Sequence, residues 1–138
     1  DLKGNFKDGK QDGIWEWYYA NGNLEVKGNY KDGKKDGLWE KYNTNGKLIS
    51  KGNIKNRKLD GLVERYFENG QLQGKRNFKD GKFNGLWEVY FENGQLRFIG
   101  NYKDGKKGSL SEHFNEDGSL KITETYKDGE RTNCEGDC

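Results

Sequence analysis

Residues 85–108 read GLWEVYFENGQLRFIGNYKDGKKG, and the same order of residue types recurs along the 138-residue chain at steps of 24 residues. The step holds for an Asn-Gly or Asp-Gly dipeptide, for a Leu two residues after it, and for the Trp, Glu and Tyr slots before it. The glycines of that dipeptide are Gly22, Gly46, Gly70, Gly94 and Gly118, without an insertion or deletion between them. So strict a period indicates an array of structural repeats that stack on their neighbours.

Each repeat contains two stretches that predict strands, one on either side of the Asn-Gly step. Residues 14–19 are dense in aromatic side chains, which suit a pleated surface, and residues 24–30 alternate apolar and polar side chains. Asn-Gly is a strong hairpin signal and predicts positive φ at both turn positions. A second turn is predicted at 31–37, where Asp-Gly occurs twice. Because short connections make neighbouring strands antiparallel, we predict an all-β fold: an elongated single antiparallel β-meander of ten or eleven strands.

The period also sets the boundaries. We divide the chain into a repeat array at 1–131, with a half unit at 1–12 and five units at 13–36, 37–60, 61–84, 85–108 and 109–131, followed by a polar tail at 132–138. The fifth unit is predicted to be a cap, since Ser111 stands in the Trp slot. Unit three departs from the pattern with Val63 in that slot, with Asn56-Arg57 in place of Asp-Gly, and with Lys75-Arg76 where Lys-Gly is usual, so we expect a local distortion there.

The composition favours a thin sheet over a thick core. Charged residues make up 35% of the chain and hydrophobic residues 30%, yet aromatics reach 14% and there are 21 glycines. Gly28, Gly52 and Gly100 fall inside predicted strands, where glycine usually marks close approach of another group. We expect aromatic rings to lie over this bare backbone and to stack from repeat to repeat. The predicted structural ladder consists of Trp15, Trp39, Trp87, Tyr18, Tyr42, Tyr66 and Tyr90.

The charged residues are interpreted as structural. The Glu at 16, 40, 64, 88 and 112 has the same surroundings in every unit, so we expect ion pairs with a cross-strand Lys such as Lys27 or Lys51 rather than catalysis. Lysines at 31, 34, 55, 58, 79, 82, 103 and 106 are predicted to line one edge of the array. The Asp-Gly turns are crowded by Lys and are not expected to hold a metal ion. His113, the single histidine, lacks partners for a catalytic set and is expected to be exposed.

The unit resembles the MORN repeat in its bacterial variant. The residues that carry the resemblance in unit two are Gly37, Trp39, Glu40, Tyr42, Asn45-Gly46, Leu48 and Gly52-Asn53, together with the Lys-Asp-Gly-Lys turns of the array. The resemblance spans residues 4 to about 130 and implies a scaffold or partner-binding module, with one bacterial group similar to antitoxin or immunity proteins. A looser resemblance, to choline-binding cell-wall repeats, rests on Trp17-Tyr18-Tyr19 followed by Asn21-Gly22 and Leu24, a triplet that only the first unit carries.

The cysteines give the only hint of a compartment. Cys134 and Cys138 are the two cysteines of the chain and lack the further ligands of a zinc site. They predict either a small disulfide loop, the leading interpretation, or free thiols. A disulfide would place the protein in an oxidising compartment, so we expect an exported location, periplasmic or at the cell surface, over a cytoplasmic one.

The functional prediction starts from the slots that vary between repeats. Slots 17 and 19 and their equivalents are predicted to share a face with the Trp ladder, and aromatic residues and Arg are what protein interfaces favour. We therefore predict a docking face for a protein partner, made of Trp17, Tyr19, Arg65, Phe67, Phe91 and His113. The alternative is binding of a lipid head group, or of a small cationic or carbohydrate ligand, through aromatic cages or the Lys edge.

Other partners and activities are less expected. A net charge of +2 argues against a nucleic-acid partner. Contact with a membrane surface is not favoured, and the open ends of the sheet would permit an end-on homodimer. We find no nucleophile, base or cofactor motif, and we expect neither a cofactor nor enzymatic activity.

Overall fold

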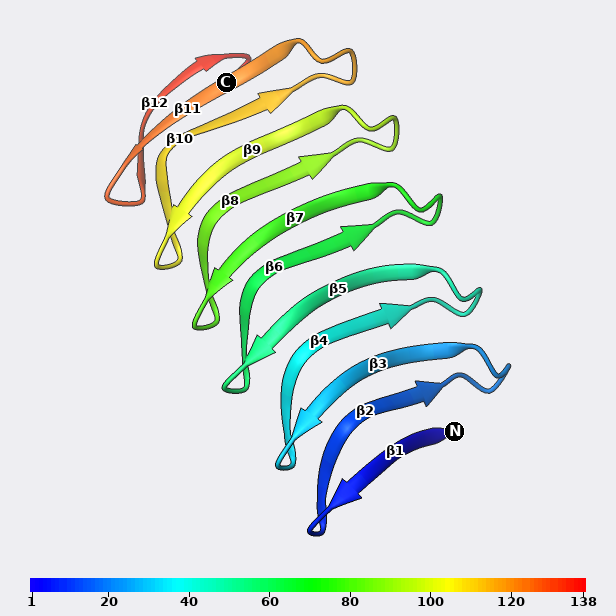
Figure 1. The fold of residues 1–138 in the computed structure, drawn as a ribbon. Helices are drawn as coiled ribbons and strands as arrows, with labels where there is room; N and C mark the ends of the chain where they lie inside the picture. Colours follow the sequence, from blue (N-terminus) through cyan, green and yellow to red (C-terminus); the bar gives the residue numbers. More distant parts are fainter.

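The computed structural model describes residues 1–138 and confirms the all-β meander. Twelve antiparallel strands form one open sheet, and each strand is hydrogen-bonded to the strands before and after it in the chain. Figure 1 shows the strands stacked in chain order along the long axis of the molecule, with the two termini at opposite ends. The structure contains no helix that is long and apolar enough to cross a membrane.

The strands repeat in pairs with nearly constant lengths. Their bounds are β1 Leu2–Lys7, β2 Lys10–Tyr18, β3 Leu24–Lys31, β4 Lys34–Tyr42, β5 Leu48–Lys55, β6 Lys58–Tyr66, β7 Leu72–Lys79, β8 Lys82–Tyr90, β9 Leu96–Lys103, β10 Lys106–Phe114, β11 Leu120–Lys127 and β12 Glu130–Gly136.

The twelfth strand corrects the expected number of ten or eleven and the expected polar tail. Glu130–Gly136 pairs with β11 through partners such as Glu124 with Cys134, and Thr125 with Asn133. Residues 132–138 were predicted to form a polar tail outside the array, whereas residues 130 and 131 were placed in unit five. Ladder hydrogen bonds come from the backbone, however, and the turn at Asp128-Gly129 is enough to return the chain alongside β11.

The two kinds of turn differ from the prediction. Positive φ at both central positions occurs at the Lys-Asp-Gly-Lys turns, as in Asp32 at 50° and Gly33 at 77°. At the Asn-Gly turns only the glycine has positive φ, as in Gly22 at 86°, so the prediction for Asn21 was wrong. There the chain forms a wider turn in which the Gly22 N–H donates to the Tyr19 carbonyl and the Asn21 side chain accepts from the Asn23 N–H. The Asn stabilises this turn with its side chain, without entering the left-handed region.

A bulge bends every unit. Between the pairs Gly28–Trp39 and Tyr30–Lys35, one intervening residue of β3 faces three of β4, and Gly37 within the bulge has a φ of 85°. Bulges bend a strand and increase its twist. Figure 1 shows the even-numbered strands turning the same corner one after another, which gives the sheet its curved cross-section.

The sheet has two different faces. We call the ring face the side that carries Trp15, Trp39, Val63, Trp87 and Ser111, and the carboxylate face the side that carries Glu16, Glu40, Glu64, Glu88 and Glu112, since neighbouring residues of a strand alternate between sides. Only seven of the 138 residues are buried. The fold therefore depends on contacts between repeats along the array, and no second layer encloses a core.

Candidate functional site

Aromatic rings on the ring face form two blocks. In the first block Trp17 lies 5.6 Å from Trp39 and 6.2 Å from Trp15, and Tyr30 lies 5.3 Å from Trp39, measured between ring centroids. The second block joins the rings of Phe78, Phe83, Trp87, Phe98, Tyr102 and His113. These spacings are those of interacting aromatic pairs. The ladder is interrupted at unit three, where Val63 takes the Trp slot.

The strand glycines make room for these side chains. A Cβ on Gly28 would overlap the indole of Trp39, as predicted, and Gly4 accommodates Trp15 in the same way. The neighbours of the other two predicted positions are different. The Val63 Cγ2 lies 2.9 Å from a Cβ placed on Gly52, and a Cβ on Gly100 would meet Phe98 and Ser111.

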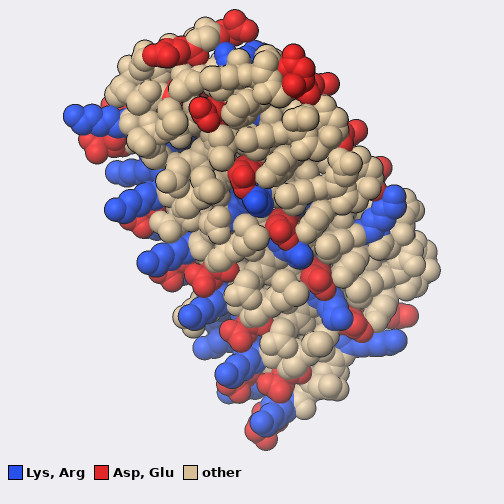
Figure 2. All heavy atoms as spheres, turned by 45° about the horizontal axis from the view of Figure 1, so that its top comes forward, with Lys and Arg blue, Asp and Glu red and all other residues tan.

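The carboxylate face carries a row of ion pairs. Lys51 lies 3.1 Å from Glu64, and Lys75 lies 2.9 Å from Glu88, which confirms the expected cross-strand pairing. The Tyr66 hydroxyl donates to Glu64 at 2.8 Å. Burial alone would raise the pKa of Glu64, but hydrogen bonds from Tyr66 and Lys51 outweigh it and lower the pKa. Figure 2 shows this row of alternating charges crossing the visible face.

The predicted ladder combined tryptophans and tyrosines. The same contacts show that its tyrosines lie on the carboxylate face, opposite the tryptophans. Each Tyr is two residues after a Glu of its own strand and shares its face, and the hydroxyls of Tyr18 and Tyr42 also donate to Glu16 and Glu40. Tyrosine hydroxyls or Lys ammonium groups thus engage Glu16, Glu40, Glu64 and Glu88 as hydrogen-bond acceptors.

The predicted docking residues fall into two groups. Trp17, Arg65 and His113 lie on the ring face, in one line with Lys41 and Val89. By contrast, Tyr19, Phe67 and Phe91 lie beyond the strand ends, in the wide turns. The Tyr19 hydroxyl donates to the Tyr42 carbonyl at 2.8 Å, and the guanidinium of Arg97 lies 5.7 Å from the Phe91 ring.

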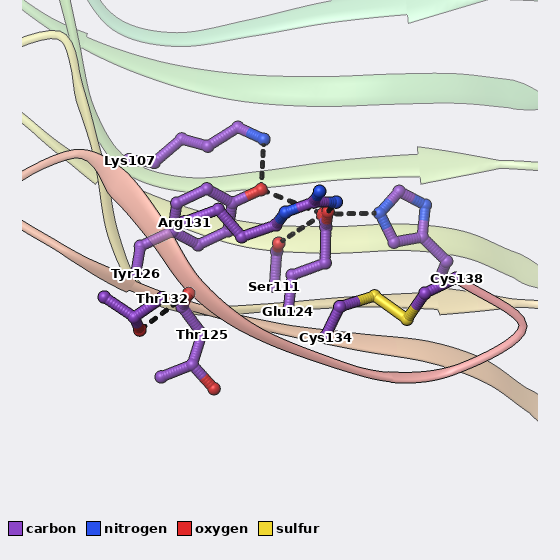
Figure 3. A network of polar contacts seen from close by, with 10 residues as sticks. Lys107, Ser111, Glu124, Thr125, Tyr126, Arg131, Thr132, Cys134 and Cys138 are labelled. Carbon is purple, nitrogen blue, oxygen red and sulfur yellow. Dashed lines mark hydrogen bonds and ion pairs between the residues drawn. A yellow bond between two sulfur atoms is a disulfide. The ribbon is translucent and has the colours of Figure 1, made fainter.

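A polar cluster at the C-terminal end was not found from the sequence (Figure 3). Glu124 accepts from Tyr126 at 2.9 Å and from Arg131 at 3.1 Å, and its Oε2 lies 3.2 Å from His113 Nε2. Burial alone would raise the pKa of Glu124, but the hydrogen bonds from Tyr126, Arg131 and His113 lower it to about 2. The cluster replaces the aromatic ladder where Ser111 stands in the Trp slot.

Two further predictions concern this end of the array. His113 packs against Phe98 with ring centroids 4.9 Å apart and is half-buried, so the expected solvent exposure was wrong. Its partner Glu124 occupies a slot that is Gly in most units. Cys134 and Cys138 are joined by a disulfide that ties the end of β12 to the last residue.

Several rings already hold a cation of the chain itself. Lys35 lies 4.2 Å from the Trp39 ring centroid, Arg76 lies 4.5 Å from that of Trp87, and Lys107 lies 4.4 Å from that of Tyr126. These faces are thus occupied by internal cation–π contacts.

The lysines line one edge, as the spacing predicted. Lys31 is the register partner of Lys34 across its Asp-Gly turn, and Lys55 and Lys58, Lys79 and Lys82, and Lys103 and Lys106 are paired in the same way. Figure 2 shows these side chains along one edge, interspersed with acidic ones.

Comparison with known proteins identifies the repeats. The family model of the MORN repeat variant matches residues 11–32, 35–56, 59–80, 83–104 and 109–128, which together cover most of the chain. No curated protein matches the chain.

Two of the similar solved structures are of TarM from S. aureus. A TarM mutant in complex with Fondaparinux, alpha-GlcNAc-glycerol and UDP is 14% identical with a TM-score of 0.45, over 69% of this chain and 19% of that one. TarM itself is 13% identical with a TM-score of 0.44, over 70% of this chain and 19% of that one. The chain thus spans about a fifth of the length of these structures.

Proposed function

The chain belongs to the MORN repeat variant family, and from this we propose that it is a non-catalytic scaffold whose ring face docks a protein partner. The observation that carries the proposal is the difference between the two faces. The carboxylate face repeats Glu in every unit, whereas the ring-face line holds Trp17, Lys41, Arg65, Val89 and His113. A surface used only for stacking would repeat its residues, while recognition of one partner requires that they differ.

The chemistry of the ring face supports a protein as the partner. Arg65 and Lys41 are exposed beside aromatic rings, and hollows open on this face at Trp17 and Val26, and again at Val63. Anchors of protein interfaces are aromatic or Arg side chains that sit in or beside such pockets. An antitoxin-like, immunity-like or cell-surface interaction role agrees with this chemistry and with the resemblance of the repeats. The Cys134–Cys138 disulfide supports an exported location.

Site-specific photo-crosslinking tests the docking face. Benzoylphenylalanine is introduced at Lys41 or Val89 on the ring face, and at Leu38 or Leu86 on the carboxylate face, in the cells that produce the protein. The control leucines are 51% and 47% exposed, so the probe is accessible there. We expect one protein to be crosslinked from both ring-face positions and from neither control, as identified by mass spectrometry. Crosslinking that is equal on both faces, or absent from the ring face, would contradict the proposal.

The Lys edge favours a second candidate, an acidic surface such as a lipid head-group layer. Like charges face each other at each turn, as Lys31 and Lys34 do, and an anion would relieve their repulsion. Exposed charges of this kind are screened by salt. Binding to anionic vesicles that is lost between about 0.1 and 1 M salt, whose Debye lengths are about 10 and 3 Å, would support this candidate. A ring-face protein complex should persist across the same range.

A further inference from the structure

Unit three opens a hollow on the ring face because three slots change together. Val63 stands where units one, two and four have Trp, Gly74 where other units have Val26, Ser50, Phe98 and Ile122, and Arg76 where most units have Gly. The hollow has a volume of about 360 Å³. Its lining residues are Leu59, Val63, Arg65, Gln73, Gly74, Arg76, Phe78, Trp87 and Val89.

Gly74 keeps the floor of the hollow bare. It is the register partner of Arg65 on β6 and of Val89 on β8, so it lies between them. A Cβ on Gly74 would lie 2.9 Å from the backbone oxygen of Glu88. A larger side chain would therefore have to displace backbone, and the space between Arg65 and Val89 stays open.

Two guanidinium groups line this space without a counter-ion. Neither Arg65 nor Arg76 takes part in an ion pair or a side-chain hydrogen bond, and none of the lining residues is acidic. Burial, and then the charge of Arg65, lower the pKa of Arg76. In the last unit the slot of Arg76 is occupied by Glu124, which pairs with Arg131, whereas Arg65 and Arg76 have no carboxylate partner.

The other residues that line the hollow indicate which kind of anion would fit beside the two guanidinium groups. Arg76 is fixed by its stacking 4.5 Å from the Trp87 ring centroid and 5.6 Å from that of Phe83. Phe78, Val89 and Leu59 supply apolar surface beside the two guanidinium groups. A planar, pre-oriented guanidinium binds a carboxylate through two parallel hydrogen bonds, and the apolar walls suit the carbon atoms attached to it.

We propose that the hollow of unit three binds a carboxylate carried on an apolar stem, supplied by an acidic side chain of the protein partner. The inference rests on the docking function proposed for the ring face and names the contact that would anchor the partner. The carboxylate lies between Arg65 and Arg76, and its stem lies against Trp87 and Val89. The residues of unit three that differ from the repeat therefore serve to bind the partner, whereas the residues in the same slots of other units serve to stack the repeats.

The first experiment tests the hollow with 3-phenylpropionate and its uncharged amide. Binding to the full chain is followed by NMR through the Arg Nε–H and Trp indole N–H signals, at low salt. We expect 3-phenylpropionate to shift the Arg65, Arg76 and Trp87 signals, and the amide to bind at least about tenfold more weakly, since charge-assisted hydrogen bonds are about twice as strong as neutral ones. No shift with 3-phenylpropionate, or equal binding of the amide, would overturn the proposal.

Matched variants locate the site. The double variant Arg65→Gln and Arg76→Gln should weaken 3-phenylpropionate binding by about tenfold or more, and Lys35→Gln with Lys41→Gln, which removes the same charge from the same face, by less than about twofold. Val63→Trp should also weaken binding by filling the hollow. That variant is expected to fold, because Gly52 offers bare backbone for the ring as Gly28 does for Trp39. Equal weakening by the Lys and Arg pairs would indicate only the net charge of the face and would overturn the site.

The second experiment separates this inference from the docking function. The partner crosslinked from Lys41 and Val89 is titrated against the wild-type chain and against the Arg65→Gln, Arg76→Gln variant. A loss of affinity of about tenfold or more supports the inference, since truncating an interface Arg anchor has effects of this size. Equal affinity would overturn the inference while the docking function stands. If 3-phenylpropionate binds but no ring-face partner exists, the docking function and the proposed protein source of the carboxylate both fail.

Discussion

Replacing Arg57 by glycine should stabilise the protein. Arg57 is the second central residue of the β5–β6 turn, where the equivalent residues are glycines, and its φ is 65°. Its neighbour Asn56 has a φ of 49°, close to the 50° of Asp32 in the first unit. The turn thus keeps the geometry of the other turns despite the change of sequence, and the distortion expected for unit three is not located here. The change of sequence therefore destabilises the fold by holding the backbone of a non-glycine residue, Arg57, in the left-handed region.

The magnitude follows from two opposing contributions. A Cβ in the left-handed region costs about 1–2 kcal/mol. Glycine also makes the unfolded chain more flexible, and this lowers the free energy of unfolding by about 0.4–1 kcal/mol. Arg57→Gly should therefore raise the free energy of unfolding by about 0.5–1 kcal/mol, because the Arg57 side chain makes no ion pair or side-chain hydrogen bond that would be lost.

The reverse substitution supplies the control. Gly105 occupies the same position two repeats further on, with a φ of 82° and no atom within 4 Å of an added Cβ. Gly105→Arg should therefore lower the free energy of unfolding by a similar amount, and the double variant should lie close to the wild type, since distant sites add. Urea unfolding followed by Trp fluorescence measures all three proteins. If Arg57→Gly destabilises the protein, the strain argument is wrong, whatever Gly105→Arg does.

Three further predictions concern the two faces and the C-terminal cluster. Gly28→Ala should lower the free energy of unfolding by about 1–3 kcal/mol, because the new methyl group overlaps the Trp39 ring, whereas Gly52→Ala should cost less because its neighbour is a Val63 methyl group; equal losses in urea unfolding would contradict the role of the ring. Val63→Trp should raise the urea midpoint by restoring the stack over Gly52, and an unchanged or lower midpoint would contradict it. The pKa of Glu124 is lowered from 4.5 to about 2, so its contacts stabilise the fold above pH 4.5 and this stabilisation is lost as the pH falls towards 2. The Tm of the wild type should therefore drop over that pH range, and the Tm of Glu124→Gln should change less. Identical Tm profiles for the two proteins would show that another group is responsible.

The architecture could be predicted because the regular 24-residue spacing of the repeats determines it. A fixed step of 24 residues leaves no room for insertions, so the short turns and the antiparallel order follow directly. The pairing of Glu64 with Lys51 could also be predicted, since register places them side by side. The φ of Asn21 could not, because Asn-Gly is compatible with a two-residue turn and with a wider turn that the Asn side chain stabilises.

The candidate site was only partly predictable, for a different reason. Alternation placed Trp17 and Arg65 on the ring face correctly, but it was extended to Tyr19, which lies past the end of β2 where alternation no longer applies. The hollow of unit three depends on Gly74 and Arg76, of which the sequence comparison between units singled out only Arg76, as a departure from Gly. That departure predicted no hollow, because only the structure shows that the slots of Val63, Gly74 and Arg76 adjoin.

The separation of the two faces explains how a sheet without an enclosed core can also recognise a partner. On the carboxylate face ion pairs form between neighbouring units, as between Glu88 of unit four and Lys75 of unit three, so these charges already have partners. On the ring face the stacking of Trp39 over Gly28 supports the neighbouring repeats, and in an array of nearest-neighbour contacts one altered unit can be tolerated if its neighbours are intact. In unit three Val63 lies between the two aromatic blocks, and Arg65 and Arg76 beside it have no counter-ion. The place where the ladder is weakest is therefore also the place where a partner's negative charge would contribute most.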